Sequence, residues 1–417
     1  MLKWFVIGMY ALKIAFNAYV DHLREVAAKR ELPDCVKDVY DETEYNRWQA
    51  YHSDKRKLDT VKSVVLAVIN IALLVGNIYS TVFKLLPGGT FVHYVLFALI
   101  FEGLNIIVYM PFEYYATFTI EEKYGMNKAT KGTFFGDQIK KFVLGFCLMG
   151  FLMFLVMGAF ENFGNKGILI ACAGVAAFLI LMQLTSGIFL RLFNKFTPLE
   201  DGSLKEKLLA LCTKYGARVK RIDSMDMSRR TTKANAFCSG IGKNKRVALA
   251  DNLIERYTED QIVAVFAHEF GHAKHKDVPK LMLGNIIRVC VTICLYAVIL
   301  NFPSLFTSFG FDGVNYYFLF MLELITWPIS TLADLVINWF GRRCEYRADA
   351  MAAKEGYGED IISALKQLNR EALKDLNPHP VVVALEYNHP TLAQRIEAVK
   401  SSQKETSPVA KENVNAG

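Results

Sequence analysis

The sequence predicts a mainly α-helical integral membrane protein with a soluble segment between its fifth and sixth spans. Three observations support this fold class. The 417 residues are 53% hydrophobic, with a mean hydropathy of +0.21, which is too apolar for a water-soluble chain of this length. Seven stretches are each long and apolar enough to cross a bilayer. Basic residues are abundant in every second loop between these stretches.

The seven predicted spans divide the chain into five parts. Residues 1–191 hold five spans, at 1–20, 61–82, 91–112, 142–160 and 168–190. Residues 192–280 form a soluble segment, 281–340 hold spans six and seven, 341–400 are soluble again, and 401–417 form a polar tail expected to be disordered. Lys13 interrupts the first span and no signal-cleavage site follows it, so we expect this span to be retained.

The lysines and arginines predict the orientation of the spans. The loops after spans one, three and five are rich in basic residues, whereas the other three loops hold at most one. Because basic loops stay in the cytosol, the soluble segment is expected there, and the N-terminus outside the cell or in a lumen. The net charge of +7 then reflects topology, and no cluster of basic and aromatic residues indicates a nucleic-acid partner.

The run His268-Glu269-Phe270-Gly271-His272 is an HExxH motif in a helix-forming part of the soluble segment. Positions i and i+4 share a helix face, so both histidines can bind one zinc ion. Glu269 lies beside that face and is a candidate general base for the attacking water. Thr258 and Gln261 have the spacing of a capping box, which predicts the start of this helix. Short strands are expected at 218–226 and 246–250.

A catalytic zinc site usually has three protein ligands, and this motif supplies two. His275 is one candidate for the third, but it lies far along the helix between two lysines. Glu345 is a better candidate, because it follows the last span and Asp349 lies one turn further on the same face. Asp349 could accept the free N–H of a zinc-bound histidine. Alternatively, both carboxylates are surface charges paired with the neighbouring arginines.

Polar residues inside the predicted spans favour a polar interior. Charged groups that face lipid are costly, whereas groups that line water or pair with each other are not. The residues concerned are Glu102, Asn105, Arg288, Glu323, Asp334 and Asn338.

The order His268-Glu269-x-x-His272, then Glu345-x-x-Ala348-Asp349, resembles that of the type I CAAX prenyl endopeptidases. These are multi-span zinc metalloproteases, known for processing prelamin A in animals and the a-factor precursor in yeast. The similarity covers most of residues 15–400. It extends to residues 118–128, 233–237, 242–246, 338–342, 389–392 and 395–396.

The resemblance implies seven spans around a water-filled chamber, capped by a cytosolic gluzincin-type zinc metalloprotease domain with a small β element. It implies one Zn²⁺ per chain on His268, His272 and Glu345. Glu269 would be the base and proton shuttle, and Asp349 would orient His268.

The same resemblance implies roles for four further residues. Asn235 and Ala236 would hold the substrate backbone on an edge strand. His389 would stabilise the tetrahedral oxyanion, and Arg395 would support the site electrostatically. On its own, His389 would be read as a loop histidine beside a proline.

Some positions depart from the family pattern. Gly341 stands where the family usually has serine, and Asn388 and Thr391 replace other residues around His389. These changes bear on substrate selection more than on chemistry. The chain is also shorter than animal and yeast members and ends without a retrieval signal. Both features suggest a bacterial or protist homologue, in a bacterial inner membrane or, if eukaryotic, in the endoplasmic reticulum.

The expected function is an integral-membrane zinc endopeptidase that cuts near membrane anchors. By resemblance, it removes the C-terminal tripeptide of prenylated CAAX proteins, acting as a monomer on peptide or protein substrates at the bilayer. The alternative is a quality-control metalloprotease that degrades misfolded or translocon-trapped proteins without a prenyl requirement. A third hypothesis, a transporter or scaffold with structural zinc, is disfavoured because such a site has no use for Glu269.

Overall fold

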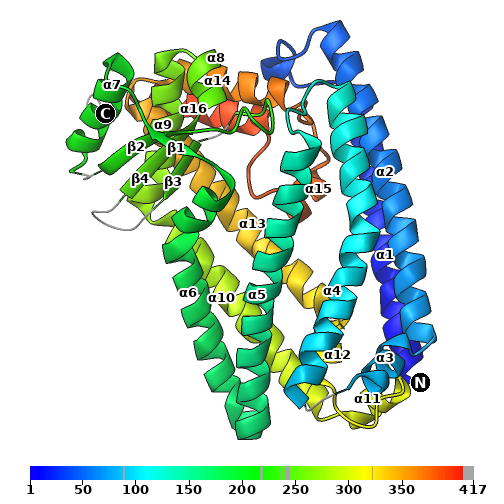
Figure 1. The fold of residues 1–417 in the computed structure, drawn as a ribbon. Coiled ribbons are helices and arrows are strands. Elements are labelled where there is room, and N and C mark those ends of the chain that lie inside the picture. The colour runs from blue at the N-terminus through cyan, green and yellow to red at the C-terminus, as the bar shows by residue number, and fades with distance from the viewer. Residues whose placement is uncertain (88–89, 217–218, 235, 240–244, 322, 407–417) are drawn as a thin grey trace, which may run out of the picture.

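The computed structural model describes residues 1–87, 90–216, 219–234, 236–239, 245–321 and 323–406. Long helices stand side by side in one part of the molecule, and a small sheet with shorter helices forms the other part (Figure 1). The N-terminus lies at the end of the long helices that is far from the sheet (Figure 1).

The part with the long helices contains ten helices in the described residues. They are α1 (Leu2–Ala27), α2 (Glu42–Val75), α3 (Ile78–Leu85), α4 (Thr90–Tyr115), α5 (Lys131–Phe163), α6 (Gly167–Phe193), α10 (Asp277–Leu300), α11 (Pro303–Ser308), α12 (Tyr316–Met321) and α13 (Glu323–Lys354). A π-helical segment, η2 (Ala116–Glu121), continues α4, and the short helical turns η1 (Asp34–Val36) and η3 (Gly164–Lys166) lie in connections.

Five of these helices are long and apolar enough to cross a membrane, judged over the described residues: α2, α4 with η2, α5, α6 and α10. The predicted first and seventh spans correspond to α1 and to α12 with α13, which are not among the five. Lysines in α1, such as Lys13, and charges in α13, such as Asp334, lower the hydropathy of these helices.

The predicted span 61–82 is not one continuous helix. α2 ends at Val75, and Asn77 adopts a left-handed conformation with φ of 54° before α3 begins. The Lys3 Nζ donates hydrogen bonds of 2.7 Å to the Val75 carbonyl and to Asn77 Oδ1. This cation holds the end of α2, because the last carbonyls of a helix lack partners within it.

The other part of the fold contains a four-stranded sheet and six helices in the described residues. These elements are β1 (Phe196–Pro198), α7 (Ser203–Lys214), β2 (Val219–Met225), β3 (Ala236–Ser239), β4 (Lys245–Ala250), α8 (Asp251–Arg256), α9 (Glu259–His275), α14 (Gly358–Glu371), α15 (Pro380–Glu386) and α16 (Leu392–Thr406). α16 includes residues 401–406, so the predicted disordered tail begins too early, and residues 407–417 lie outside the described residues.

The strand order is β1-β2-β4-β3, which leaves β3 at an edge of the sheet. β2 and β4 are parallel, whereas β1 and β3 run antiparallel to their neighbours. The strands predicted at 218–226 and 246–250 are confirmed as β2 and β4. β1 was not predicted, because three residues are too short to show an alternating pattern.

The helix that carries the HExxH motif, α9, begins at the predicted capping box. Thr258 Oγ1 accepts a hydrogen bond from the Gln261 backbone N–H, and the Gln261 side chain accepts one from the Thr258 N–H. The helix ends at His275, because Lys276 is left-handed with φ of 55° and α10 starts at the next residue. Most of α9 is buried in the core that it shares with the sheet and the C-terminal helices.

The loop after η2 attaches the long helices to the sheet region. The Lys128 N–H donates to the Arg230 carbonyl (3.1 Å), and the Thr232 N–H donates to the Met126 carbonyl (3.3 Å). Arg230 also binds Asp137 of α5 through two nitrogens, at 2.7 and 3.2 Å. These contacts hold the segment before β3 against the ends of α4 and α5.

Candidate active site

His268 and His272 of α9 and Glu345 of α13 form the one group in the described residues that has the spacing of metal ligands. The two Nε2 atoms of the histidines lie 3.2 Å apart. Glu345 Oε1 is 3.2 Å from His272 Nε2, and Oε2 is 3.5 Å from His268 Nε2. A tetrahedral zinc ion with ligands at about 2.0–2.1 Å separates neighbouring ligand atoms by about 3.3 Å. The three side chains therefore fit a metal of this kind.

The close approach of α9 and α13 depends on Gly271, within the HExxH motif. A Cβ atom at this position would lie 2.9 Å from the Ala348 Cα, closer than real Cβ atoms come to a backbone atom. Any other residue at 271 would push the helices apart. Glu345 lies one turn before Ala348 on α13, so the glycine lets the third ligand reach the histidines.

Glu345 carries a buried charge at the centre of this cluster. Glu345 is 5% exposed. His389 Nδ1 lies 2.9 Å from Glu345 Oε2, but the geometry is not that of a hydrogen bond, so this oxygen has no hydrogen-bond partner among the described residues. Burial would raise the pKa of Glu345, but contacts with His272 and His389 and the nearby charges of His268 and Arg395 lower it well below the usual range. An ionised carboxylate with an unpaired oxygen suits a metal ligand.

The pKa of His272 is shifted in the opposite direction. Burial would lower it, but the hydrogen bond and charge of Glu345, together with Asp277 and Glu269, raise it to about 9 in the metal-free protein. Negative charge is thus concentrated around the two imidazoles, which favours a cation.

Asp349 and Arg395 support His268. His268 Nδ1 lies 2.8 Å from Asp349 Oδ1, so Nε2 is left to face the cluster. Arg395 of α16 donates two hydrogen bonds to the carboxylate of Asp349, at 2.7 and 2.8 Å. Asp349 is 0% exposed. The alternative in which Glu345 and Asp349 are surface charges is therefore wrong, because both lie inside the protein.

His272 has a matching support that the sequence reasoning missed. Its Nδ1 lies 3.1 Å from Oδ2 of Asp277, the first residue of α10, and Asp277 is 1% exposed. Arg347 of α13 donates a hydrogen bond of 2.8 Å to the other oxygen of this carboxylate. The sequence offered one signal, the carboxylate of Asp277 five residues after His272. In an uninterrupted helix, a residue at this spacing would point away from the imidazole of His272. The left-handed turn at Lys276 brings it back to the imidazole.

The structure places Glu269 and His389 beside this cluster. Glu269 is half-buried, lies next to His268 in α9, and makes no hydrogen bond or ion pair with the described residues. His389 is largely exposed and reaches Glu345 from the segment between α15 and α16. His275, the other candidate ligand, is not part of the cluster.

Two departures around His389 complement each other in the structure. A Cβ at Gly341 would lie 3.0 Å from the carbonyl oxygen of Asn388, which is tighter than usual, so glycine lets the His389 segment lie close to α13. Thr391 caps α16: its Oγ1 accepts from the Gln394 N–H (3.3 Å), and Gln394 Oε1 accepts from the Thr391 N–H (3.0 Å). Thr391 therefore helps to fix the helix that carries Arg395.

Of the two residues expected to hold a substrate backbone, Ala236 is buried at the start of β3, where it pairs with Leu249 of β4. Asn235 lies outside the described residues. Lys233, just before this strand, forms an ion pair of 3.2 Å with Glu121 of η2. β3 packs against α9, so this edge of the sheet lies beside the helix that carries the histidines.

Comparison with known proteins agrees with this architecture. Residues 22–195 match the model of the CAAX prenyl protease N-terminal region, with five membrane helices, and residues 198–403 match peptidase family M48. A CAAX prenyl protease 1 homolog from Arabidopsis thaliana is 31% identical, over 96% of this chain and 98% of its own. CAAX prenyl protease 1 of Saccharomyces cerevisiae is 26% identical, over 95% of each.

The crystal structure of S. mikatae Ste24p has the same fold. It superposes with a TM-score of 0.90 at 24% identity, covering 96% of this chain and 99% of the other. Three findings point to the same family. The described residues contain five helices apolar enough to cross a membrane, the M48 segment holds a metal-ligand cluster, and the relative from Arabidopsis is 31% identical over nearly its whole length. The chain therefore belongs to the CAAX prenyl protease 1 family and is a multi-pass membrane metallopeptidase.

Proposed function

We propose that this chain is a zinc endopeptidase that removes the C-terminal tripeptide of prenylated CAAX proteins. The observation that carries the proposal is the convergence of His268, His272 and Glu345, with Glu269 next to His268 in α9 and without a partner among the described residues. Two imidazoles and one carboxylate form a donor set that suits one Zn²⁺ per chain and leaves a fourth position open. The substrate class follows from the names of the relatives from Arabidopsis and yeast.

Bound zinc would polarise the scissile carbonyl and activate water. Glu269 would take the proton from the attacking water and return it to the leaving amine. His389 would donate a hydrogen bond to the developing oxyanion. Asp349 would hold the Nδ1 proton of His268, and Arg395 would keep Asp349 ionised and in place.

The edge strand β3 supports an extended substrate at this site. It is an edge strand of the described sheet, and an extended peptide could add to it, with Asn235 and Ala236 as the residues expected to hold the peptide backbone. Such binding would bring a peptide carbonyl alongside α9, because β3 packs on that helix.

We also propose that α1 and α13 cross the membrane with the five apolar helices, giving seven spans around a water-filled chamber, with the active site in the cytosol. Arg288 of α10 donates a hydrogen bond of 2.8 Å to Asp334 of α13, and both side chains are partly exposed. A partly exposed ion pair within membrane helices is much less costly beside water than beside lipid.

The basic loops near the sheet support the cytosolic side for the active site. We expect one chain to be sufficient for activity.

The test compares wild type and Glu269→Gln in detergent, with a farnesylated CAAX peptide and the same peptide without lipid. We expect wild type to cleave the farnesylated peptide faster, and Glu269→Gln to keep its zinc but lose cleavage. Equal rates on both peptides would favour the quality-control alternative. Cleavage by Glu269→Gln at the wild-type rate would remove Glu269 from the role of base.

A further inference from the structure

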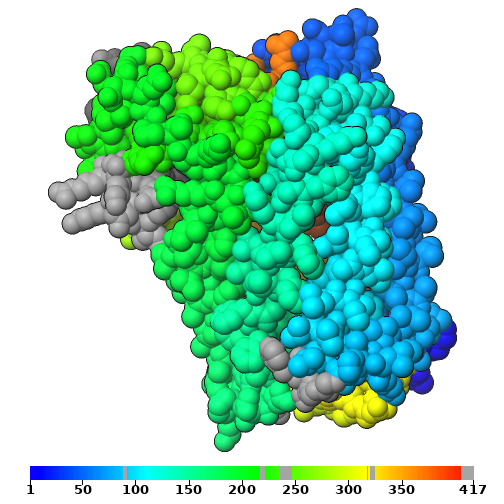
Figure 2. Space-filling view, viewed as in Figure 1, coloured from blue at the N-terminus to red at the C-terminus, as the bar shows by residue number. Residues whose placement is uncertain are grey.

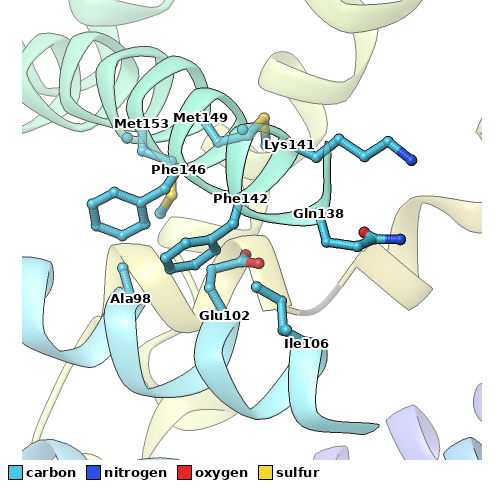
Figure 3. Close-up of a pocket in the computed structure, with 11 residues that line it drawn as sticks. Ala98, Glu102, Ile106, Gln138, Lys141, Phe142, Phe146, Met149 and Met153 are labelled. Carbon is cyan, nitrogen blue, oxygen red and sulfur yellow. The ribbon is translucent and has the colours of Figure 1, made fainter. Parts of the chain in front are cut away.

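A groove of about 300 Å³ lies between α4 and α5, within helices that are apolar enough to cross a membrane. Figure 2 shows the surface hollowed along the boundary between the cyan α4 and the green α5. The close-up in Figure 3 shows aromatic and methionine side chains of α5 facing Glu102 and Ile106 of α4.

The groove exists because α5 packs differently on its two sides. Toward α6, glycines allow close contact: a Cβ at Gly174 would lie 2.5 Å from Leu155, and one at Gly167 would lie 2.1 Å from the Ala159 carbonyl oxygen. Toward α4, Gly145 and Gly150 line the groove, and a Cβ at either position would meet nothing within 4 Å. Small residues in membrane helices usually bring helices together. Here they leave open space instead.

The lining changes from polar to apolar along α5. Gln138 and Lys141 lie at one end of the groove, and Phe146 and Met153 lie at the other (Figure 3). The polar end is next to the sheet region, because Asp137 binds Arg230 of that region. The groove thus begins near the part of the molecule that holds the metal-ligand cluster and becomes more apolar as it extends into the membrane helices.

Glu102 places a carboxylate in the lining of the groove, and charged side chains are rare on surfaces that face lipid. Its carboxylate forms no ion pair with the described residues, and an unpaired charge within a membrane span is costly unless water reaches it. We therefore expect water to reach Glu102 on the α4 side of the groove. An apolar chain that lies along the phenylalanine and methionine wall of α5 and leaves this water in place gains the free energy of burial there, and methionines adapt to its shape.

We propose that this groove holds the isoprenoid chain of the lipidated substrate, with the attached peptide leaving at the Gln138 and Lys141 end toward the sheet region. The inference rests on the proposed prenyl-protein substrate. A volume of about 300 Å³ is at the small end of ligand sites and suits a single isoprenoid chain better than a two-chain phospholipid.

Filling the groove tests the proposal. Gly145→Leu and Gly150→Leu place an isobutyl group in open space, so we expect both variants to fold and to retain the wild-type metal content. KM for the farnesylated peptide should rise about tenfold, the effect of losing roughly two buried methylene groups. KM for the same peptide without lipid should stay at the wild-type value. Gly158→Leu, on the same helix and also in open space but outside the groove, is the matched control and should change neither value.

The outcomes separate this proposal from the proposed function. If wild type cleaves both peptides equally well, the prenyl-protein function fails, and the groove proposal fails with it. If wild type prefers the farnesylated peptide but the groove variants keep its KM unchanged, only the groove proposal is overturned. An equal rise in KM for both peptides would also overturn it, since that would indicate damage to the fold or loss of a structural lipid.

Discussion

The two histidines of the HExxH motif have matching supports of unequal strength. Each presents Nδ1 to a buried aspartate, and each aspartate is held by an arginine. Beside His268, Arg395 is 11% exposed and binds Asp349 through two nitrogens. Beside His272, Arg347 is 39% exposed and binds Asp277 through one. The first arrangement is closed, and the second is open to water.

The two supports also connect the cluster to different parts of the chain. Asp349 lies near the C-terminal end of α13, where this helix packs in the core shared with α9, and Arg395 lies on α16 of the same core, so His268 is held from within that core. Asp277 is the first residue of α10, a helix long and apolar enough to cross the membrane. The position of His272 therefore depends on a membrane helix. We expect changes in the first support to affect folding and metal binding together, and changes in the second to affect mainly metal binding.

Asp349→Asn should have the largest effect. It removes the charge that pairs with buried Arg395, and breaking a buried pair costs about 3–5 kcal/mol of unfolding free energy. It also replaces the charged acceptor that orients His268 with a neutral amide oxygen, and the weaker hydrogen bond lowers metal affinity about 10–100-fold. Thermal unfolding and competition with a chelator measure the two effects. If this variant unfolds at the wild-type temperature, the buried pair of Asp349 and Arg395 does not stabilise the fold as described.

Asp277→Asn should lower metal affinity about tenfold, with a smaller loss of stability, because water can solvate the exposed Arg347. The same chelator competition and melting curves apply. Asp201→Asn removes a fully exposed carboxylate that pairs with Lys205 and serves as the matched control, with neither quantity changed. If Asp277→Asn binds metal like wild type, the second support has no role in positioning His272.

The apparent metal affinity should rise with pH. The pKa of His272 is raised to about 9 in the metal-free protein, so below that pH a proton must leave before the imidazole can bind metal. The affinity should increase between pH 7 and pH 9 and then level off. In Asp277→Asn the levelling should occur at lower pH, because one of the groups that raise the pKa is lost. An affinity that does not change between pH 7 and pH 9 would contradict this prediction.

Gly341→Ser should have the smallest effect. The added Cβ presses on the Asn388 carbonyl and moves His389 by a few tenths of an ångström, without touching the metal ligands. We expect kcat to fall a few-fold, with metal affinity and melting temperature unchanged. A loss of metal in this variant would show that the His389 segment also supports the cluster.

The sequence predicted the elements whose signals are local. The capping box at Thr258, two of the four strands and the HExxH helix all depend on residues close in the chain. The position of Glu345 could be anticipated because a single helix carries it out of the last predicted span. Asp277 was missed because its contact with His272 depends on a left-handed residue, Lys276, that no periodic pattern reveals.

Other features depended on tertiary packing. The end of α2 at Val75 is set by Lys3, more than seventy residues earlier in the chain. The role of Gly271 follows from the approach of α13, and that of Gly341 from the approach of Asn388. Glycines that matter for distant contacts look like any other glycine in a sequence. The groove between α4 and α5 likewise depends on tertiary packing, because it exists only where these two helices do not pack closely against each other.

The central claim is that Glu345 completes a metal site with His268 and His272. The most direct measurement is the metal content of purified wild type, Glu345→Gln and Glu269→Gln after equal exposure to zinc and removal of excess ion. We predict about one zinc per chain in wild type and in Glu269→Gln, and a large loss in Glu345→Gln, with all three folded. Full zinc content in folded Glu345→Gln would contradict the claim.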